Sequence, residues 1–127
     1  NSGTNQTDFF SYDPSSDTWA TELDFTDAAI TSGSTIARSY GVSFVMNNKG
    51  YITTGSGGGN NTWVYDPSVT PKTWTAVRAF EGANRYNAVG WTLNNVGYVL
   101  TGSGSTTNFY DDLWSFTPDV EQSEVGK

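Results

Sequence analysis

An eleven-residue phrase occurs twice in this chain of 127 residues, and this repetition constrains the fold more than any other feature. The phrase is NNKGYITTGSG at residues 47–57 and NNVGYVLTGSG at residues 94–104, so the two copies lie 47 residues apart. The same offset relates Arg38 to Arg85. Periods of about 20–50 residues are typical of repeat architectures, in which each repeat is one supersecondary unit. We therefore expect two successive copies of one structural unit.

Each copy has the pattern of short antiparallel strands. Residues 39–46 and 86–93 are mostly apolar and are followed by Asn-Asn. This pair favours a tight hairpin because Asn tolerates positive φ. The return strand ends at Thr-Gly-Ser-Gly, and residues 62–66 and 113–117 predict a third strand that closes in a Pro turn. In the first copy, Trp74 lies in a fourth. Four antiparallel strands in about 47 residues form one blade of a β-propeller.

The composition agrees with an all-β fold and excludes several functions. Aromatic residues make up 15% of the chain and glycine occurs 14 times, which suits pleated strands and tight turns. The absence of Cys and His removes thiolate and imidazole metal sites and the Ser-His and Cys-His nucleophile pairs. The net charge of −7 disfavours nucleic acid and anionic membranes, and no apolar run is long enough for membrane insertion. We expect no cofactor and no metal.

The order of the repeated residues resembles a known motif. Arg, Gly-Tyr, Thr-Gly-x-Gly, Tyr-Asp-Pro and Thr-Trp follow one another as in the kelch repeat of galactose-oxidase-like, secreted bacterial propellers, from about residue 8 to about residue 118. The paired glycines usual in that motif appear here as Gly-Ser-Gly at 55–57 and 102–104. The resemblance implies an all-β protein with kelch-type blades and an extracellular or cell-surface location.

Counting strands in fours divides the chain into blades. Residues 1–23 are expected to form the outer strands of a preceding blade, and residues 38–77 a complete kelch blade. Residues 85–117 provide the first three strands of a partial blade, whose fourth strand is missing, and residues 118–127 form a polar tail or linker. These nine strands make an incomplete ring of about two to two and a half blades, whereas propellers have about four to eight.

An incomplete ring implies that other blades are the partners of this chain. They belong either to the same longer polypeptide or to copies of the chain that assemble head to tail into a ring or a filament. Open strand edges at both ends favour such association. The sequence leaves these alternatives open.

The candidate ligand-binding residues lie on the face that carries the loops after the second strands and the links between blades. Arg38 and Arg85 begin the innermost strands, where a guanidinium suits a carboxylate ligand; an arginine that bonds loop carbonyls is the alternative. Phe109 and Tyr110 offer a stacking platform for a sugar or a peptide, unless they pack on a neighbouring blade. The other candidates are Tyr86, Asn60, Asn61 and Asp111. Four aspartates could supply oxygen ligands for Ca²⁺, but they lack the spacing of a known Ca²⁺-binding loop, so we expect them to be solvated acids. They are Asp24, Asp27, Asp111 and Asp112.

These observations predict a non-enzymatic module of a secreted or cell-surface protein. It would bind a protein or a glycan, self-assemble through its open blade edges, or do both. The alternative is a fragment of a sugar-active, mutarotase-like enzyme whose site is completed by missing blades. In that case Glu81, the one glutamate near Arg85 on the loop face, is the candidate acid.

Overall fold

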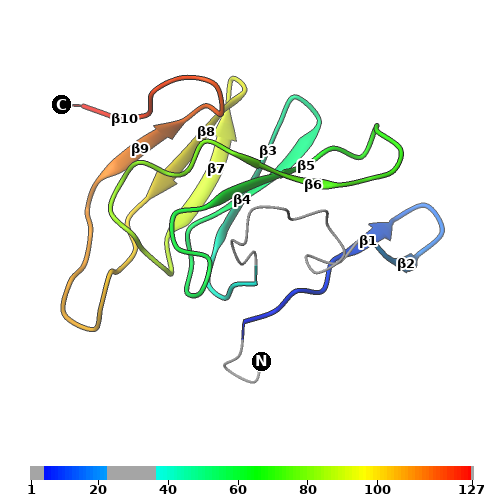
Figure 1. Ribbon diagram of the computed structural model, residues 1–127, viewed down its shortest axis with the longest axis horizontal. Helices are drawn as coiled ribbons and strands as arrows, with labels where there is room; N and C mark the ends of the chain where they lie inside the picture. Colours follow the sequence, from blue (N-terminus) through cyan, green and yellow to red (C-terminus); the bar gives the residue numbers. More distant parts are fainter. Residues whose placement is uncertain (1–4, 23–36, 127) are drawn as a thin grey trace.

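The computed structural model describes residues 5–22 and 37–126, and the ten elements in these ranges are all strands (Figure 1). No helix in the described part of the chain is long and apolar enough to cross a membrane. The strands form two four-stranded antiparallel sheets and one hairpin, so the all-β prediction is confirmed. Each four-stranded sheet is one blade, and the two blades together form part of a propeller ring.

The first blade is formed by four strands in the order of the sequence, β3-β4-β5-β6. The two-residue turn between the inner strands has φ values of 49° at Asn47 and 59° at Asn48, and the repeat places Asn94 and Asn95 at 49° and 64°. Asn adopts this left-handed region at low cost, which is why the sequence turns here. The strands are β3 (Val42–Met46), β4 (Lys49–Thr53), β5 (Thr62–Tyr65) and β6 (Trp74–Val77).

The second blade also has four strands, in the order β7-β8-β9-β10, and this corrects the expectation that its fourth strand is missing. Ser123 pairs with Ser115 and Glu124 pairs with Trp114. The segment has no strand pattern of its own, but tertiary bonds hold it in place. The Gln122 amide donates to Ala79 O at 2.7 Å and accepts from Glu81 N at 3.0 Å. The strands are β7 (Val89–Leu93), β8 (Val96–Leu100), β9 (Leu113–Phe116) and β10 (Ser123–Glu124).

A separate hairpin of β1 (Phe10–Asp13) and β2 (Thr18–Thr21) precedes the first blade, and all eight of its residues are exposed. Its flanking residues attach it to the outer strands of that blade. The Phe9 ring lies 5.0 Å from the ring of Trp74, and Glu22 accepts a hydrogen bond from Tyr65 at 3.0 Å. The hairpin is therefore anchored at its base rather than along its length.

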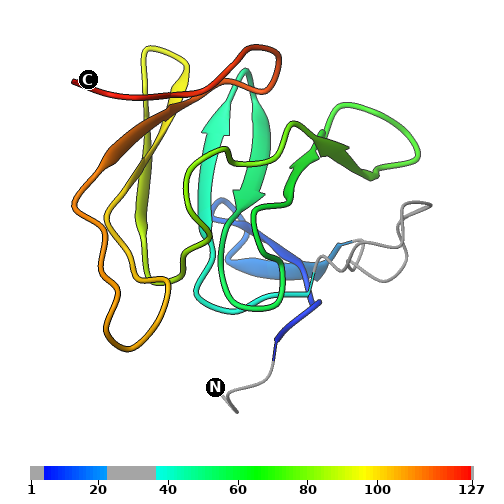
Figure 2. The ribbon, with the colours of Figure 1, turned by 60° about the vertical axis from the view of Figure 1, so that its left-hand side comes forward.

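The blades pack through their inner strands, with β3 next to β7 (Figure 2). The Phe44 ring covers Gly97, where a Cβ atom would lie 2.6 Å from a ring carbon. Phe44 also packs against Phe116, with 5.4 Å between ring centroids. At the next position Thr92 Oγ1 donates to Val45 O at 2.7 Å. The larger core cluster thus lies between the two blades, and the absence of a side chain at Gly97 sets how closely they approach. A second cluster of Trp63, Tyr65 and Trp74 lies in the outer strands of the first blade, against Phe9.

We expect Gly97→Ala to lower the free energy of unfolding by about 1–3 kcal/mol, the usual cost of overpacking a buried contact. The added methyl group meets the Phe44 ring, which is held by its neighbours and cannot move away. Urea denaturation followed by tryptophan fluorescence measures the change. Gly50→Ala is the matched control, because Gly50 occupies the equivalent position of the first blade and has nothing within 4 Å of the new atom. Equal stability of the two variants would contradict this account of the interface.

Candidate functional site

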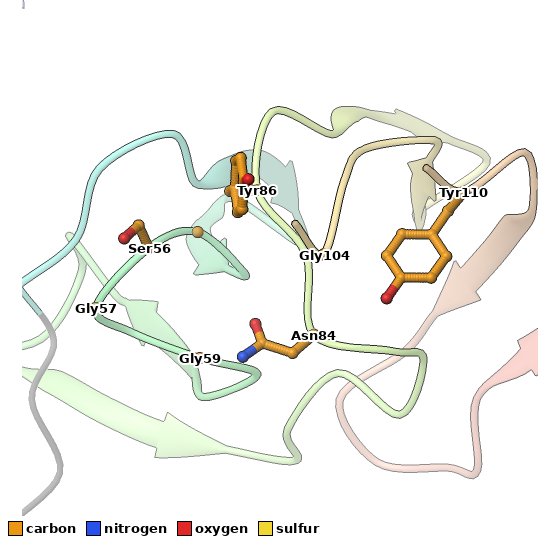
Figure 3. A pocket seen from close by; sticks show the side chains of 8 residues that line it. Ser56, Gly57, Gly59, Asn84, Tyr86, Gly104 and Tyr110 are labelled. Carbon is orange, nitrogen blue, oxygen red and sulfur yellow. The ribbon is translucent and has the colours of Figure 1, made fainter. Parts of the chain in front are cut away.

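A hollow of about 570 Å³ opens where loops of the two blades meet (Figure 3). It lies between the loop that follows β4, the link that precedes β7 and the loop that follows β8. We call it the loop-face pocket. Its lining residues are Gly55, Ser56, Gly57, Gly59, Asn84, Tyr86, Gly104 and Tyr110.

Buried arginines fix the loops that form the pocket. The second strand of each blade is followed by a threonine with positive φ, 56° at Thr54 and 59° at Thr101, a costly conformation for a β-branched residue. Arg38 donates to Thr54 O at 2.9 Å, and Arg85 donates to Thr101 O at 3.0 Å. Each guanidinium therefore holds the point at which its strand turns into the pocket loop.

Arg85 also connects the pocket to the third strand of the second blade. Its Nη1 and Nη2 atoms donate to the two carboxylate oxygens of Asp112 at 2.5 and 2.8 Å. Its guanidinium carbon lies 4.4 Å from the centroid of the Tyr110 ring and 5.1 Å from that of Phe80. The hydrogen bond from Arg85 lowers the pKa of Asp112 below its usual range. Arg85 thus supports Tyr110 from the protein interior. It is only 1% exposed, and its charge is paired with Asp112.

The structure brings two of the predicted ligand-binding residues, Tyr86 and Tyr110, into the pocket. Arg38 and Arg85 are buried beneath it and bond loop carbonyls. Ligand contact by either guanidinium stays a prediction, as it does for the other four residues, none of which lines the pocket. The Asn60 amide donates to Gly82 O at 2.8 Å, Asn61 O accepts from Arg38 at 3.1 Å, Phe109 is 73% exposed, and Asp111 is exposed.

Asn84 also lines the pocket, although it is not among the residues predicted from the sequence, and its side chain reaches toward the loop of Gly59 (Figure 3). The repeat gives no signal for it, because the equivalent residue of the first copy is Ala37. The pocket glycines did have a signal in the doubled Gly-Ser-Gly phrase. Gly55 has φ of 94°, which a residue with a side chain rarely adopts. Because it has no side chain, it leaves space in this part of the pocket.

The side chains that line the pocket are all uncharged at neutral pH. They offer a hydroxyl group at Ser56, an amide at Asn84 and two phenol rings, so the pocket can form hydrogen bonds in both directions and stack on a flat apolar face. The described residues contain no group of three or more acidic side chains placed to hold a metal ion. Asp24 and Asp27 lie outside the described residues.

Glu81 does not line the pocket. Its carboxylate accepts a hydrogen bond from the backbone N–H of Gln122 at 2.7 Å and forms an ion pair with Arg78 at 2.5 Å. The bond from Gln122 is the first cause of a lowered pKa, and the bond from Arg78 adds to it. Glu81 is therefore ionised at neutral pH and holds β10 against the link between the blades.

Comparison with known proteins shows the fold. No protein-family model matches the chain, and no curated protein matches it. A solved structure titled "Structure of YjhT" is similar to it, with a TM-score of 0.62 and 24% sequence identity. The likeness covers 70% of this chain and 27% of that chain, so the chain corresponds to about a quarter of the YjhT structure.

We expect Asp112→Asn to lower the free energy of unfolding by about 3 kcal/mol at pH 7, because it leaves the buried Arg85 charge without its partner. The folded-state pKa of Asp112 lies below the unfolded value of about 3.9, so this stabilisation is present above that value and is lost as the pH falls through the lowered pKa. Urea denaturation at pH 7 and at about pH 2 tests both points.

The difference between wild type and Asp112→Asn should shrink at the lower pH. The matched control is Asp111→Asn, which changes the neighbouring exposed carboxylate and should have little effect at either pH. A loss that is the same size at both pH values would show that charge pairing is not its cause.

Proposed function

We propose that the chain is part of a kelch-type propeller and serves as a non-enzymatic binding module of a secreted or cell-surface protein. Its ligand is an uncharged sugar group, held in the loop-face pocket. The order of the motif residues and the likeness to the YjhT fold support the propeller. The observation that carries the binding function is the convergence on one hollow of Asn84 and Tyr86, from the link before β7, with Ser56 from the loop after β4 and Tyr110 from the loop after β8.

The pocket has the chemistry that a neutral sugar needs. Its volume of about 570 Å³ falls in the range of small-molecule sites, about 300–1,000 Å³. A phenol ring offers an apolar face to the C–H groups of a sugar, and the Asn84 amide can donate to one hydroxyl and accept from another. The net charge of −7 works against an anionic ligand. Tyr110 is held from behind by Arg85, so its ordering costs little on binding.

The alternative is a mutarotase-like, sugar-active enzyme completed by other blades. Such a site needs a general acid or base within hydrogen-bonding reach of the substrate, with a pKa near the working pH. Glu81, the candidate for this role, forms bonds with Arg78 and Gln122 and has a lowered pKa. No observation on the described residues favours this alternative, so we propose binding without catalysis.

Asn84→Ala should weaken sugar binding about tenfold, the loss expected for one or two hydrogen bonds. Isothermal titration calorimetry of the chain against neutral saccharides (glucose, galactose, N-acetylglucosamine and lactose) measures the dissociation constant. The matched control is Phe10→Ala, which removes an exposed aromatic ring of β1 outside the pocket and should leave the constant unchanged. Binding that is lost in the control and kept in Asn84→Ala would refute the pocket as the site.

A further inference from the structure

The contact between the two blades has two complementary sides. The first blade contributes an apolar row along β3, whose side chains are only 1–6% exposed. The second blade contributes a slot with little side-chain bulk, in which Gly90 and Gly97 leave room for Val42 and Phe44. A Cβ atom would lie 2.0 Å from Val42 at Gly90 and 2.6 Å from Phe44 at Gly97. The apolar row of the first blade is Val42, Phe44 and Met46.

The repeat gives the second blade an apolar row of its own, 47 residues further on, and this row is uncovered. Its side chains are 36–56% exposed. The Trp91 ring stacks on the Tyr98 ring, with 5.5 Å between centroids and 14° between planes. Phe44 stacks on Tyr51 in the same way, at 5.9 Å and 20°. The second row therefore already has the arrangement that is buried in the first. It consists of Val89, Trp91 and Leu93.

The first blade likewise has a slot of its own, on the side away from the second blade, and among the described residues only Asp8 and Phe9 border it from outside the blade. Gly50 is the repeat equivalent of Gly97, yet a Cβ atom on Gly50 would have nothing within 4 Å. A cavity of about 430 Å³ lies here. Val45 in the same slot is 62% exposed. The residues that line this cavity include Ser43, Val45, Gly50, Ile52, Phe9 and Trp74.

We propose that the chain associates head to tail with a second copy of itself, with Trp91 of one copy packed on Gly50 of the next. The occupant is a second copy because one chain carries both halves of the contact on opposite sides of the pair of blades, an exposed apolar row and a slot bordered by the base of the β1–β2 hairpin. The contact between Phe44 and Gly97 supplies the geometry. Two different patches meet in this interface, so it is heterologous and propagates into a ring or an open chain.

The β1–β2 hairpin has to move when a copy docks. Its Tyr-Asp-Pro phrase, residues 12–14, matches residues 65–67 at the end of β5, so the hairpin corresponds to the outer strands of a blade. A docked blade brings outer strands of its own. The hairpin is exposed throughout and is attached mainly through Phe9 and Glu22, so it can swing aside at the cost of those contacts. Ser43 replaces Gly90 in the slot, so the copies sit slightly further apart at that end.

The proposal is tested by sedimentation velocity over a wide range of concentrations, with the whole chain and two variants. Trp91→Ser removes the centre of the apolar row, and Gly50→Val fills the slot. Within one copy, Trp91→Ser removes the stacking on Tyr98, and Gly50→Val places its Cβ atom where no described atom lies within 4 Å. Phe109→Ser is the matched control, since it removes an aromatic ring of higher exposure that belongs to neither surface.

The wild type and Phe109→Ser should exceed the chain mass of 13.7 kDa as concentration rises. Trp91→Ser and Gly50→Val should each weaken association at least tenfold. An equimolar mixture of these two variants should form a dimer of twice the chain mass and nothing larger, because each retains the half that the other lacks. Urea denaturation confirms that both variants fold, and Leu93→Ser replaces Trp91→Ser if that variant does not.

Three results would overturn the proposal. A wild type that stays at 13.7 kDa throughout has no such interface. Association that survives Gly50→Val but not Trp91→Ser means that two apolar rows meet each other, as in a two-fold dimer. Equal weakening by Phe109→Ser means that exposed aromatic rings associate without a specific slot. None of these results bears on sugar binding in the loop-face pocket, which lies on a different part of the surface.

Discussion

The buried guanidinium of Arg85 is the interaction on which the second blade depends. It fixes the carbonyl of Thr101 at a strained turn, pairs with Asp112 at the start of β9, and lies under the ring of Tyr110. A buried charge is tolerated only when it is paired and hydrogen-bonded, so strand end, carboxylate and ring are specified together. Arg38 does the corresponding work in the first blade, where its buried guanidinium donates to Thr54 O and Asn61 O. Burial accordingly lowers the pKa of Arg38 to about 10.

The sequence predicts the features that depend on local conformation and on repetition. The Asn-Asn turns form because Asn tolerates positive φ, and the offset of 47 residues places equivalent side chains at equivalent points of two blades. The features that could not be predicted from the sequence depend on contacts between distant segments. β10 exists because Gln122 bonds with Ala79 and Glu81, and no strand pattern marks it. Asn84 enters the pocket from the link before β7, and the equivalent residue of the first copy is Ala37 rather than Asn.

Repetition of sequence does not produce equal environments. Phe44 and Trp91 occupy the same position of their blades, but one ring is 6% exposed and the other 36%. Gly97 and Gly50 differ in the same sense, one crowded by an aromatic ring and the other facing open space. The conformations are set by each repeat, whereas burial is set by the neighbours that each repeat has. Equivalent residues of the two repeats can therefore be buried in one blade and exposed in the other.

The clasp formed by Gln122 and Glu81 determines how a pulling force would pass through the molecule. Gln122, immediately before β10, is bonded to residues 79–81, which lie in the link between β6 and β7. A load applied at the C-terminus would thus reach the junction of the two blades as well as the outermost strand. Tension would pass first through the pairs of β9 and β10 and then to the hydrogen bonds of the clasp, which lie immediately before β10. A module built in this way resists peeling from its edge, where a sheet is mechanically weakest.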